Sequence, residues 1–373
     1  MEVLLSGIMS ITPKQIAMIV IGGILLYLAI SKKFEPTLLL PMGFGVIMVN
    51  LPLSGAINHM VNGTPIEGIL DLLFEQGIAT ELFPLLIFIG IGAMIDFGPL
   101  LQKPFMIFLG AAAQFGIFFT VILALLLGFE INEAASIGII GAADGPTSIF
   151  VASQLAKNLL GPISVAAYSY MALVPIIQPF AIKLVTTKNE RMIRMPYQEG
   201  AISRRTKILF PIIVTLVAGL ISPQSVPLIG FLMFGNLMKE SGVVESLSKS
   251  AQNELVNIST ILLGLAISST MKAEQFLQVS TLLIMGMGLV AFIFDTIGGV
   301  LFVKFINLFR KEKINPMVGA AGISAFPMSA RVVQKLAVKE DPTNFVLMYS
   351  ISANVSGQIA SVIAGGLILS LLS

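Results

Sequence analysis

Long apolar runs separated by short polar loops follow one another almost without a break from Gln15 to Leu372. The hydrocarbon of a bilayer offers no water to the backbone, so amide groups in such runs must bond within each segment as helices do. Only 11% of the 373 residues are charged and 56% are hydrophobic, whereas soluble domains carry about 25% charged residues. The chain is therefore predicted to be an all-α integral membrane protein, and a single soluble core is excluded.

Ten stretches are apolar over a length that suits a bilayer with about 30 Å of hydrocarbon. They are residues 15–31, 37–51, 82–97, 104–128, 162–185, 208–222, 226–238, 255–270, 276–308 and 344–372. Two further apolar segments, 135–158 and 315–337, are interrupted by Gly, Pro and polar residues, which predicts discontinuous helices. We expect about ten or eleven transmembrane helices in a multi-pass protein.

Basic residues are concentrated in a few loops. Lys and Arg gather at 32–33, between 183 and 207 and at 310–313, whereas the loop 130–133 is acidic. By the positive-inside rule the basic loops are cytoplasmic. The most polar stretch falls at the midpoint and predicts a linker between two halves. The expected organisation is an N-terminal segment (1–14), a first membrane repeat (15–186), a cytoplasmic linker (187–207) and a second membrane repeat (208–373).

Short motifs recur in the same order in the two halves. Gly141-Ala142-Ala143 is repeated as Gly319-Ala320-Ala321, and Tyr168-Ser169 as Tyr349-Ser350, at a nearly constant offset. A constant offset indicates an internal duplication. If each half has five full spans and one broken segment, the odd number turns the second half upside down. We therefore expect two inverted repeats, each with a discontinuous or re-entrant segment.

Inverted repeats place ion sites where their discontinuous helices meet. The sequence thus nominates Ile139–Ser153 and Asn315–Arg331 as the two walls of a site. The alternative is that Gly and Pro are simply frequent in spanning helices. That alternative does not account for the polar residues at the breaks.

Asp144 is the one acidic residue in an otherwise uncharged run, Ala134 to Gln154. A carboxylate at membrane depth costs about 2.5–3.5 kcal/mol on insertion scales and must find a cation, a proton or water. Gly145-Pro146 breaks the helix there and frees carbonyl oxygens, and Thr147 adds a hydroxyl. Such an oxygen-only ligand set suits a hard cation such as sodium. The alternative is an Asp-Gly turn at the membrane surface.

The composition excludes several other kinds of chemistry. The chain has no cysteine and a single histidine, His59, so thiolate nucleophiles, iron–sulfur clusters and Cys-based zinc sites are absent. A net charge of +2 does not indicate a nucleic-acid partner. In the second broken segment, Asn315 offers an amide oxygen and Ser324 a hydroxyl, so one carboxylate and neutral oxygens would serve one monovalent cation.

Other polar residues have competing interpretations. Arg331 could bind a substrate carboxylate or extend to the cytoplasmic face beside neighbouring lysines. Tyr170 could pass a proton or anchor a helix at the interface. Asn354 and Gln358 share a helix face and could bond across helices. Asp96 and Asp295 are further acids: Asp96 fits a helix terminus at the interface, and Asp295 fits a second ion or proton ligand.

At these motifs the chain resembles the β subunit of the sodium-translocating, biotin-dependent decarboxylases, which act on oxaloacetate, glutaconyl-CoA, methylmalonyl-CoA or malonate. The resemblance runs from about residue 16 to the end. The motifs that carry it are Gly92-Ala93-Met94-Ile95-Asp96-Phe97-Gly98-Pro99-Leu100, Gly141-Ala142-Ala143-Asp144-Gly145-Pro146-Thr147, Gly322-Ile323-Ser324-Ala325-Phe326-Pro327-Met328 with Arg331, and Asn354-Val355-Ser356-Gly357.

The resemblance implies an enzymatic function in a multisubunit complex of a bacterial or archaeal cytoplasmic (inner) membrane. The β subunit would decarboxylate carboxybiotin, consume a proton and export sodium. Its partners would be a biotin carrier subunit, a carboxyltransferase α subunit and a small single-span γ or δ subunit, and the chain would form a homo-oligomer.

The resemblance also implies roles for individual residues. Asp144, Asn315, Ser324 and Asn354 would bind sodium, and Asp144, Tyr170 and Arg331 would be catalytic. Tyr170 would help in proton delivery and Arg331 would face the carboxybiotin. A sodium-coupled secondary transporter of organic anions needs the same cation site and is the alternative function.

Overall fold

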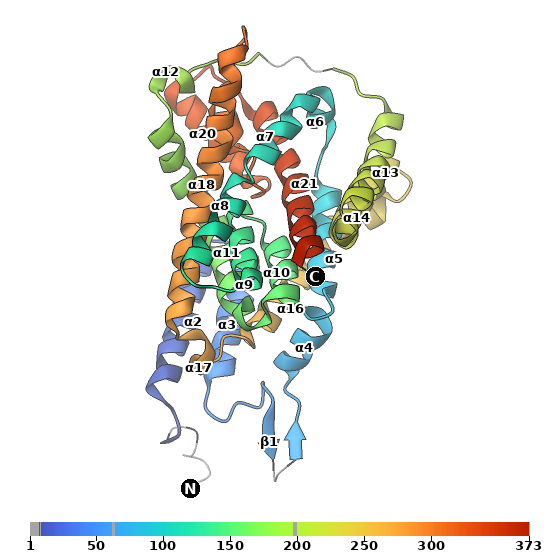
Figure 1. The fold of residues 1–373 in the computed structure, drawn as a ribbon. Helices are drawn as coiled ribbons and strands as arrows, with labels where there is room; N and C mark the ends of the chain where they lie inside the picture. Colours follow the sequence, from blue (N-terminus) through green and yellow to red (C-terminus); the bar gives the residue numbers. More distant parts are fainter. Residues whose placement is uncertain (1–6, 8, 62–63, 197–199, 373) are drawn as a thin grey trace.

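The computed structural model describes residues 7, 9–61, 64–196 and 200–372. These residues form an elongated bundle of helices with one short pair of strands (Figure 1). The elements of the first part of the chain are α2 (Pro13–Ser31), α3 (Pro36–Asn50), β1 (His59–Val61), β2 (Thr64–Ile66), α4 (Ile69–Gly77), α5 (Leu82–Met94), α6 (Gly98–Gln102), η1 (Pro104–Met106), α7 (Ile107–Ala112), α8 (Phe115–Leu126), α9 (Ile131–Gly138), η2 (Ile139–Ala142), α10 (Gly145–Leu155), η3 (Lys157–Leu159), α11 (Leu160–Val185) and α12 (Lys188–Arg191).

The elements that follow α12 are again helical. They are α13 (Arg204–Ile221), η4 (Pro223–Ser225), α14 (Val226–Ser241), α15 (Glu245–Ser250), η5 (Ala251–Leu255), α16 (Val256–Ser268), α17 (Ala273–Phe276), α18 (Val279–Phe309), α19 (Met317–Ala320), α20 (Met328–Glu340) and α21 (Leu347–Leu372). The prediction of an all-α membrane protein is confirmed.

Within the described ranges, four helices are long and apolar enough to cross a membrane, or six if each of two bent pairs is one span. Other expected spans coincide with shorter helices, such as α3 with 15 residues and α16 with 13 residues. The number of ten or eleven spans therefore stays a prediction.

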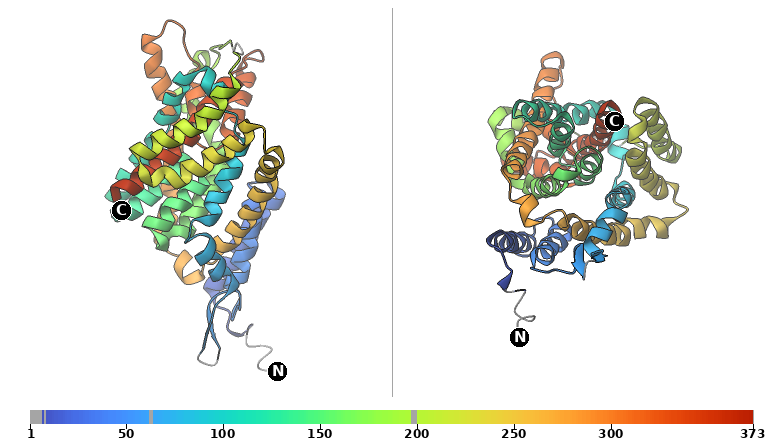
Figure 2. Two further views of the ribbon diagram at one scale, coloured as in Figure 1. Left: turned by 90° about the vertical axis from the view of Figure 1, so that its right-hand side faces the viewer. Right: turned by 60° about the horizontal axis from the view of Figure 1, so that its bottom comes forward.

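The two ends of the bundle differ. We call the end that carries α12 and the basic residues around it the linker end, and the end that carries β1 and β2 the β end (Figure 1). The strands pair antiparallel, with Met60 opposite Pro65. The α2–α3 pair and the α13–α14 pair lie at separate edges of the bundle, around a centre that contains α10, α11, α18 and α21 (Figure 2).

The first broken segment is a re-entrant hairpin, formed by α9, η2 and α10. The chain turns at Ala143, whose φ of +52° lies in the left-handed region, which costs a non-Gly residue free energy. Asn158, after α10, donates to the Glu133 carboxylate at the start of α9 across 3.0 Å. The two arms therefore return to the same side of the protein.

The second broken segment, residues 315–340, is also a re-entrant hairpin, formed by α19 and α20. The side-chain amides of Asn315 before α19 and Asn344 after α20 both donate to the backbone carbonyls of Arg191 and Ile193 in the linker. Both arms of this hairpin therefore return to the linker end.

The long helix α18 shows that the hairpins enter from opposite ends. Near its start, Thr281 shares a cavity with Asn158 of the first hairpin and with Asp71 of α4, next to the β strands. Near its other end, Lys304 donates to the Val185 carbonyl and forms an ion pair with Glu190 in the linker. Opposed hairpins are what an inverted repeat produces; the repeat boundaries stay a prediction.

Candidate functional site

The tips of the two re-entrant hairpins touch inside the protein. The backbone N–H of Ser324, between α19 and α20, donates to the backbone carbonyl of Ala142 across 2.9 Å. The Ser324 hydroxyl donates to the Gly357 carbonyl in α21 across 2.8 Å. The Asn354 amide, also in α21, donates to the Ile323 carbonyl across 2.6 Å. The structure thus brings the two predicted walls together, with α21 packed against them.

Asp144 lies at the tip of the first hairpin, where it caps α10. Its side chain is buried, with 2% exposed. Oδ1 accepts from the Thr147 amide across 3.2 Å. Oδ2 accepts from the Thr147 hydroxyl across 2.7 Å, from the Gln358 amide across 2.8 Å and from the Ser361 hydroxyl across 2.7 Å. All of these donors are uncharged, and no Lys or Arg among the described residues forms an ion pair with Asp144.

A buried carboxylate without a charged partner is stabilised by binding a cation or a proton. The hydroxyls of Thr147 and Ser361 each have lone pairs that can turn towards a cation. The Gln358 amide presents its nitrogen to Asp144, and a half-turn of the amide would present its oxygen instead. One carboxylate with neutral oxygens is a donor set for a hard monovalent cation.

Small residues let the neighbouring helices approach this tip. A methyl group on Gly145 would lie 2.3 Å from the Tyr168 ring in α11, and one on Gly365 in α21 would lie 2.8 Å from the Thr147 methyl. Larger side chains at either glycine would push these helices away from Asp144. Close packing therefore sets the distance between the carboxylate and its partners on α21.

Asn354 has an unused acceptor next to the hairpin tips. Its side chain is fully buried, and its Oδ1 has no hydrogen-bond partner. An unpaired buried amide oxygen costs free energy unless a ligand satisfies it. Asn354 therefore remains a candidate oxygen donor for a cation.

Asn315 has a different environment from the one expected. Its amide nitrogen donates to the linker carbonyls of Arg191 and Ile193, and its Oδ1 accepts from the Met317 amide across 3.0 Å. These partners belong to the linker and to the second hairpin, and none is Asp144. In this structure Asn315 therefore fastens the second hairpin to the linker.

The tyrosines of α11 lie in two different places. The Tyr170 hydroxyl donates to the Met285 carbonyl in α18, and its ring lies against Gly288. Tyr170 makes no hydrogen bond with Asp144 among the described contacts, whereas the Tyr168 ring covers the adjacent Gly145. The structure places Tyr168 rather than Tyr170 at the Asp144 turn.

Arg331 lies on α20 with an exposed side chain. Its guanidinium makes no hydrogen bond or ion pair with the residues that the structure describes. The structure does not bring it to Asp144. Its guanidinium is left available for a ligand or for water.

Asp96 follows the end of α5 and lies outside this site. Its Oδ1 accepts from the Gly98 amide across 2.8 Å and lies 3.6 Å from Lys207 Nζ, and its side chain is 56% exposed. These contacts agree with the expected helix terminus at the interface.

Ser361 was not expected from the sequence. It lies three residues after Gln358 and seven after Asn354 on α21, so the three polar residues share one helix face. The recurrence of amide and hydroxyl side chains on that face of α21 is the signal that could have revealed it.

A cavity of about 760 Å³ opens at the linker end. Basic and aromatic residues line it, including Lys103, Phe105, Arg310 and Lys313. The Lys103 ammonium is half-buried and makes no ion pair among the described residues. Ile314, another lining residue, directly precedes Asn315. The cavity therefore suits an anionic ligand with a ring.

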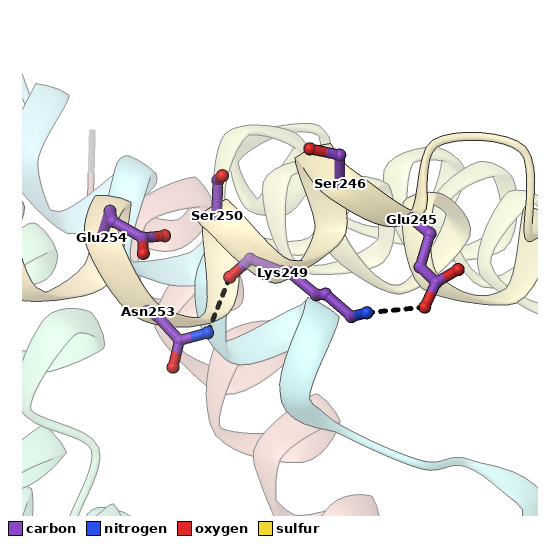
Figure 3. A pocket seen from close by; sticks show the side chains of 6 residues that line it. All are labelled: Glu245, Ser246, Lys249, Ser250, Asn253 and Glu254. Carbon is purple, nitrogen blue, oxygen red and sulfur yellow. Dashed lines mark hydrogen bonds and ion pairs between the residues drawn. The ribbon is translucent and has the colours of Figure 1, made fainter.

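A second, smaller hollow lies on α15 and η5, where Figure 3 shows its polar lining. Lys249 pairs there with Glu245 across 2.8 Å, and both side chains are largely exposed. Exposed pairs of this kind contribute little to stability. No residue of either hairpin lines this hollow.

The fold and the site together define a membrane protein with a buried carboxylate site between opposed re-entrant hairpins. Residues 14–372 match the family described as the Na+-transporting oxaloacetate decarboxylase beta subunit. The chain belongs to this family and is a membrane β subunit of the sodium-pumping decarboxylases.

Curated relatives agree with this assignment over almost their whole length. The methylmalonyl-CoA decarboxylase subunit beta of Propionigenium modestum is 49% identical over 98% of this chain and 97% of its own. The glutaconyl-CoA decarboxylase subunit beta of Acidaminococcus fermentans is 48% identical over 98% and 96%. The oxaloacetate decarboxylase beta chain of Haemophilus ducreyi is 46% identical over 98% and 97%. All three relatives are decarboxylase subunits. This favours the function of a decarboxylase subunit over the alternative, a sodium-coupled secondary transporter.

Proposed function

We propose that this subunit decarboxylates carboxybiotin and couples the reaction to sodium export, with Asp144 as the sodium-binding carboxylate. One observation carries the proposal: Asp144 is buried where the tips of two opposed hairpins meet, and only uncharged groups bond to it. A bound sodium ion would neutralise this charge. Thr147, Gln358 and Ser361 surround the carboxylate, and Asn354 offers a free oxygen beside the hairpin tips.

The cavity at the linker end is the proposed binding site of the other substrate, carboxybiotin. Its basic residues fit the carboxylate of carboxybiotin, and its aromatic rings fit the bicyclic ring. Arg310 already lies over the Phe105 ring, with its guanidinium carbon 5.3 Å from the ring centroid. Lys103 would hold the ligand's carboxylate, and exposed Arg331 would lie towards the carboxybiotin.

The reaction itself requires one proton. Protonation of the biotin nitrogen accompanies cleavage of its bond to the carboxyl carbon, and carbon dioxide leaves. Tyr170, whose hydroxyl donates to the Met285 carbonyl between α11 and α18, would help to deliver this proton. Asn315 and Ser324 would complete the sodium ligands after a rearrangement that frees Asn315 from the linker.

The assembly follows from the same proposal. A biotin carrier subunit, a carboxyltransferase α subunit and a small single-span γ or δ subunit would join this chain, which would form a homo-oligomer in a bacterial or archaeal cytoplasmic membrane. The basic linker end would face the cytoplasm and the carrier.

The test adds free carboxybiotin to the purified complex, with and without sodium, and measures the release of carbon dioxide. We expect sodium to stimulate the release. A release rate that does not depend on sodium would contradict the proposal and favour a carrier of organic anions. Sodium uptake into vesicles that contain the complex then tests the coupling.

A further inference from the structure

Asp295 is a second buried acid, in the middle of α18. Its side chain is 0% exposed. Oδ1 accepts from the backbone N–H of Ile117, in the first turn of α8, across 3.2 Å, whereas Oδ2 has no hydrogen-bond partner among the residues that the structure describes. No Lys, Arg or His in the described part of the chain forms an ion pair with it.

The carboxyl group of Asp295 lies directly against the first hairpin. A methyl group on Gly141 would lie 2.7 Å from Oδ2, and one on Gly116 would lie 2.4 Å from Oδ1. Gly141 is in η2, three residues before Asp144. The hairpin tip is thus held between two acids: Asp144 bonds to α21, and Asp295 contacts the tip from α18.

The hydrogen bonding of Asp295 fits a protonated carboxyl group. Oδ1 accepts an N–H and serves as the carbonyl oxygen, so the free Oδ2 is the oxygen that carries a proton. An ionised carboxylate in this place would have one backbone N–H and no charged group of the described residues to offset its desolvation. The neutral acid avoids that cost.

No other titratable group bonds to Asp295. The elements packed against α18 are α7, α8, α9, α11, α19 and η2. Their titratable residues are Glu133 on α9, with Tyr168, Tyr170 and exposed Lys183 on α11, and α18 itself adds Lys304. The first turn of α8 favours a negative charge, so the ionised form also has a stabilising contact. Burial therefore favours the neutral form of Asp295, and the start of α8 favours the ionised form.

We propose that Asp295 is a proton-binding site, distinct from the sodium site, on the α18 side of the hairpin tip. A hard cation needs several oxygen ligands, whereas Oδ2 faces the backbone of Gly141 and has no polar partner. A proton needs only the carboxyl group. The same helix carries Met285, whose carbonyl accepts from Tyr170, and Thr281, which lines the cavity at the β end.

The use of this proton in carboxybiotin decarboxylation rests on the proposed function, but the binding of the proton does not. The test is therefore made on the purified chain without carboxybiotin. A negative result for Asp295 would not contradict the proposal that Asp144 binds sodium.

The experiment uses the infrared C=O stretch of protonated carboxyl groups, recorded against pH for Asp144→Asn and for Asp144→Asn with Asp295→Asn. We expect a protonated-carboxyl band that is lost with Asp295 and that falls about tenfold per pH unit above its midpoint. Asp96→Asn in the same background is the matched control and should leave the band unchanged. Absence of any band that depends on Asp295 would show that the group is ionised and only caps α8.

Labelling with a hydrophobic carbodiimide, which reacts with protonated carboxyl groups in membranes, gives a second measurement. Peptide mass spectrometry should find Asp295 modified at low pH, and sodium should protect Asp144 but not Asp295. Protection of Asp295 by sodium would make it a cation site and overturn the proposal. Circular dichroism of Asp295→Asn checks that the variant is folded.

Discussion

The hydroxyl of Ser361, on α21, donates to Oδ2 of Asp144, at the tip of the first re-entrant hairpin, across 2.7 Å. This bond joins the last helix of the chain to a turn more than two hundred residues earlier. It makes α21 part of the proposed sodium site.

Ser361→Ala removes one hydroxyl from the Asp144 carboxylate. If this hydroxyl oxygen turns to contact the bound ion, as proposed, its loss removes an interaction with a charged group of about 1.5 kcal/mol or more, so we expect the sodium concentration for half-maximal decarboxylation to rise about tenfold or more. Sodium titration of the decarboxylation rate measures this. Ser370→Ala is the control, because Ser370 lies on the same helix but bonds to the Gly366 carbonyl and the Ser222 hydroxyl rather than to Asp144. Equal sodium dependence in both variants would remove Ser361 from the site.

Asp144→Asn keeps the shape of the side chain and removes its charge. We expect loss of sodium-dependent carboxybiotin decarboxylation and of sodium uptake into vesicles, because the neutral amide cannot balance the ion. The two activities are measured on the same preparation. Retained uptake with normal sodium dependence would place the ion elsewhere.

Gly357→Ala adds a methyl group at a helix contact. That methyl group would lie 1.9 Å from the Gly322 carbonyl oxygen in the second hairpin, and overpacking of this kind costs about 1–3 kcal/mol. We expect a lower melting temperature in detergent and weaker sodium binding. Gly23→Ala is the control, since no atom lies within 4 Å of its added methyl group. An unchanged melting temperature for Gly357→Ala would mean that α21 can shift freely.

Asp341 gives the protein a dependence of stability on pH. The hydrogen bond from Arg194, together with the amide and hydroxyl of Thr343, lowers the pKa of Asp341 to about 2. A lowered pKa in the folded state stabilises the fold above the unfolded value of about 3.9, and this stabilisation is lost as the pH falls towards 2. The melting temperature of Asp341→Asn should therefore lie below that of the wild type at pH 7, and the difference should disappear near pH 2. A difference that does not change with pH would show that packing, and not the charge of Asp341, causes the destabilisation.

Lys103→Gln tests the cavity at the linker end. If Lys103 binds the carboxylate of carboxybiotin, the KM for free carboxybiotin should rise about tenfold or more, because a hydrogen bond to a charged group contributes about 1.5–3 kcal/mol. The sodium dependence should not change. Lys249→Gln, in the exposed pair of Figure 3, is the control for a lost surface charge. An unchanged KM would exclude this cavity as the binding place.

The sequence nominated Asp144 and the two broken segments, which the structure brings together, but it did not reveal the partners of Asp144 on other helices. Asp144 was evident as an acid in an uncharged run. Gln358 was read as part of a polar contact between helices and Ser361 was missed, because their approach to Asp144 depends on how α21 packs on α10. Successive residues of a helix are rotated by about 100°. Tyr168 and Tyr170 therefore point in different directions, and the sequence alone could not place Tyr168 at the Asp144 turn.

Asn315 illustrates a second limit. Its position in the second broken segment was correctly read from the repeat, but its amide bonds to linker carbonyls. Backbone carbonyls carry no sequence signal, because every residue supplies one. A prediction of sodium ligands from residue type alone could not show that the Asn315 side chain bonds to these linker carbonyls instead.

The Ser324–Ala142 contact between the hairpin tips is made by backbone atoms alone. Apart from proline at position 324, no substitution removes either bonding group. The hydrogen bond between the two tips therefore does not depend on which side chains stand at positions 142 and 324, whereas a methyl group on Gly357, beside it, would collide with the Gly322 carbonyl. Subunits that serve different acids can in this way keep one common contact between the two hairpins.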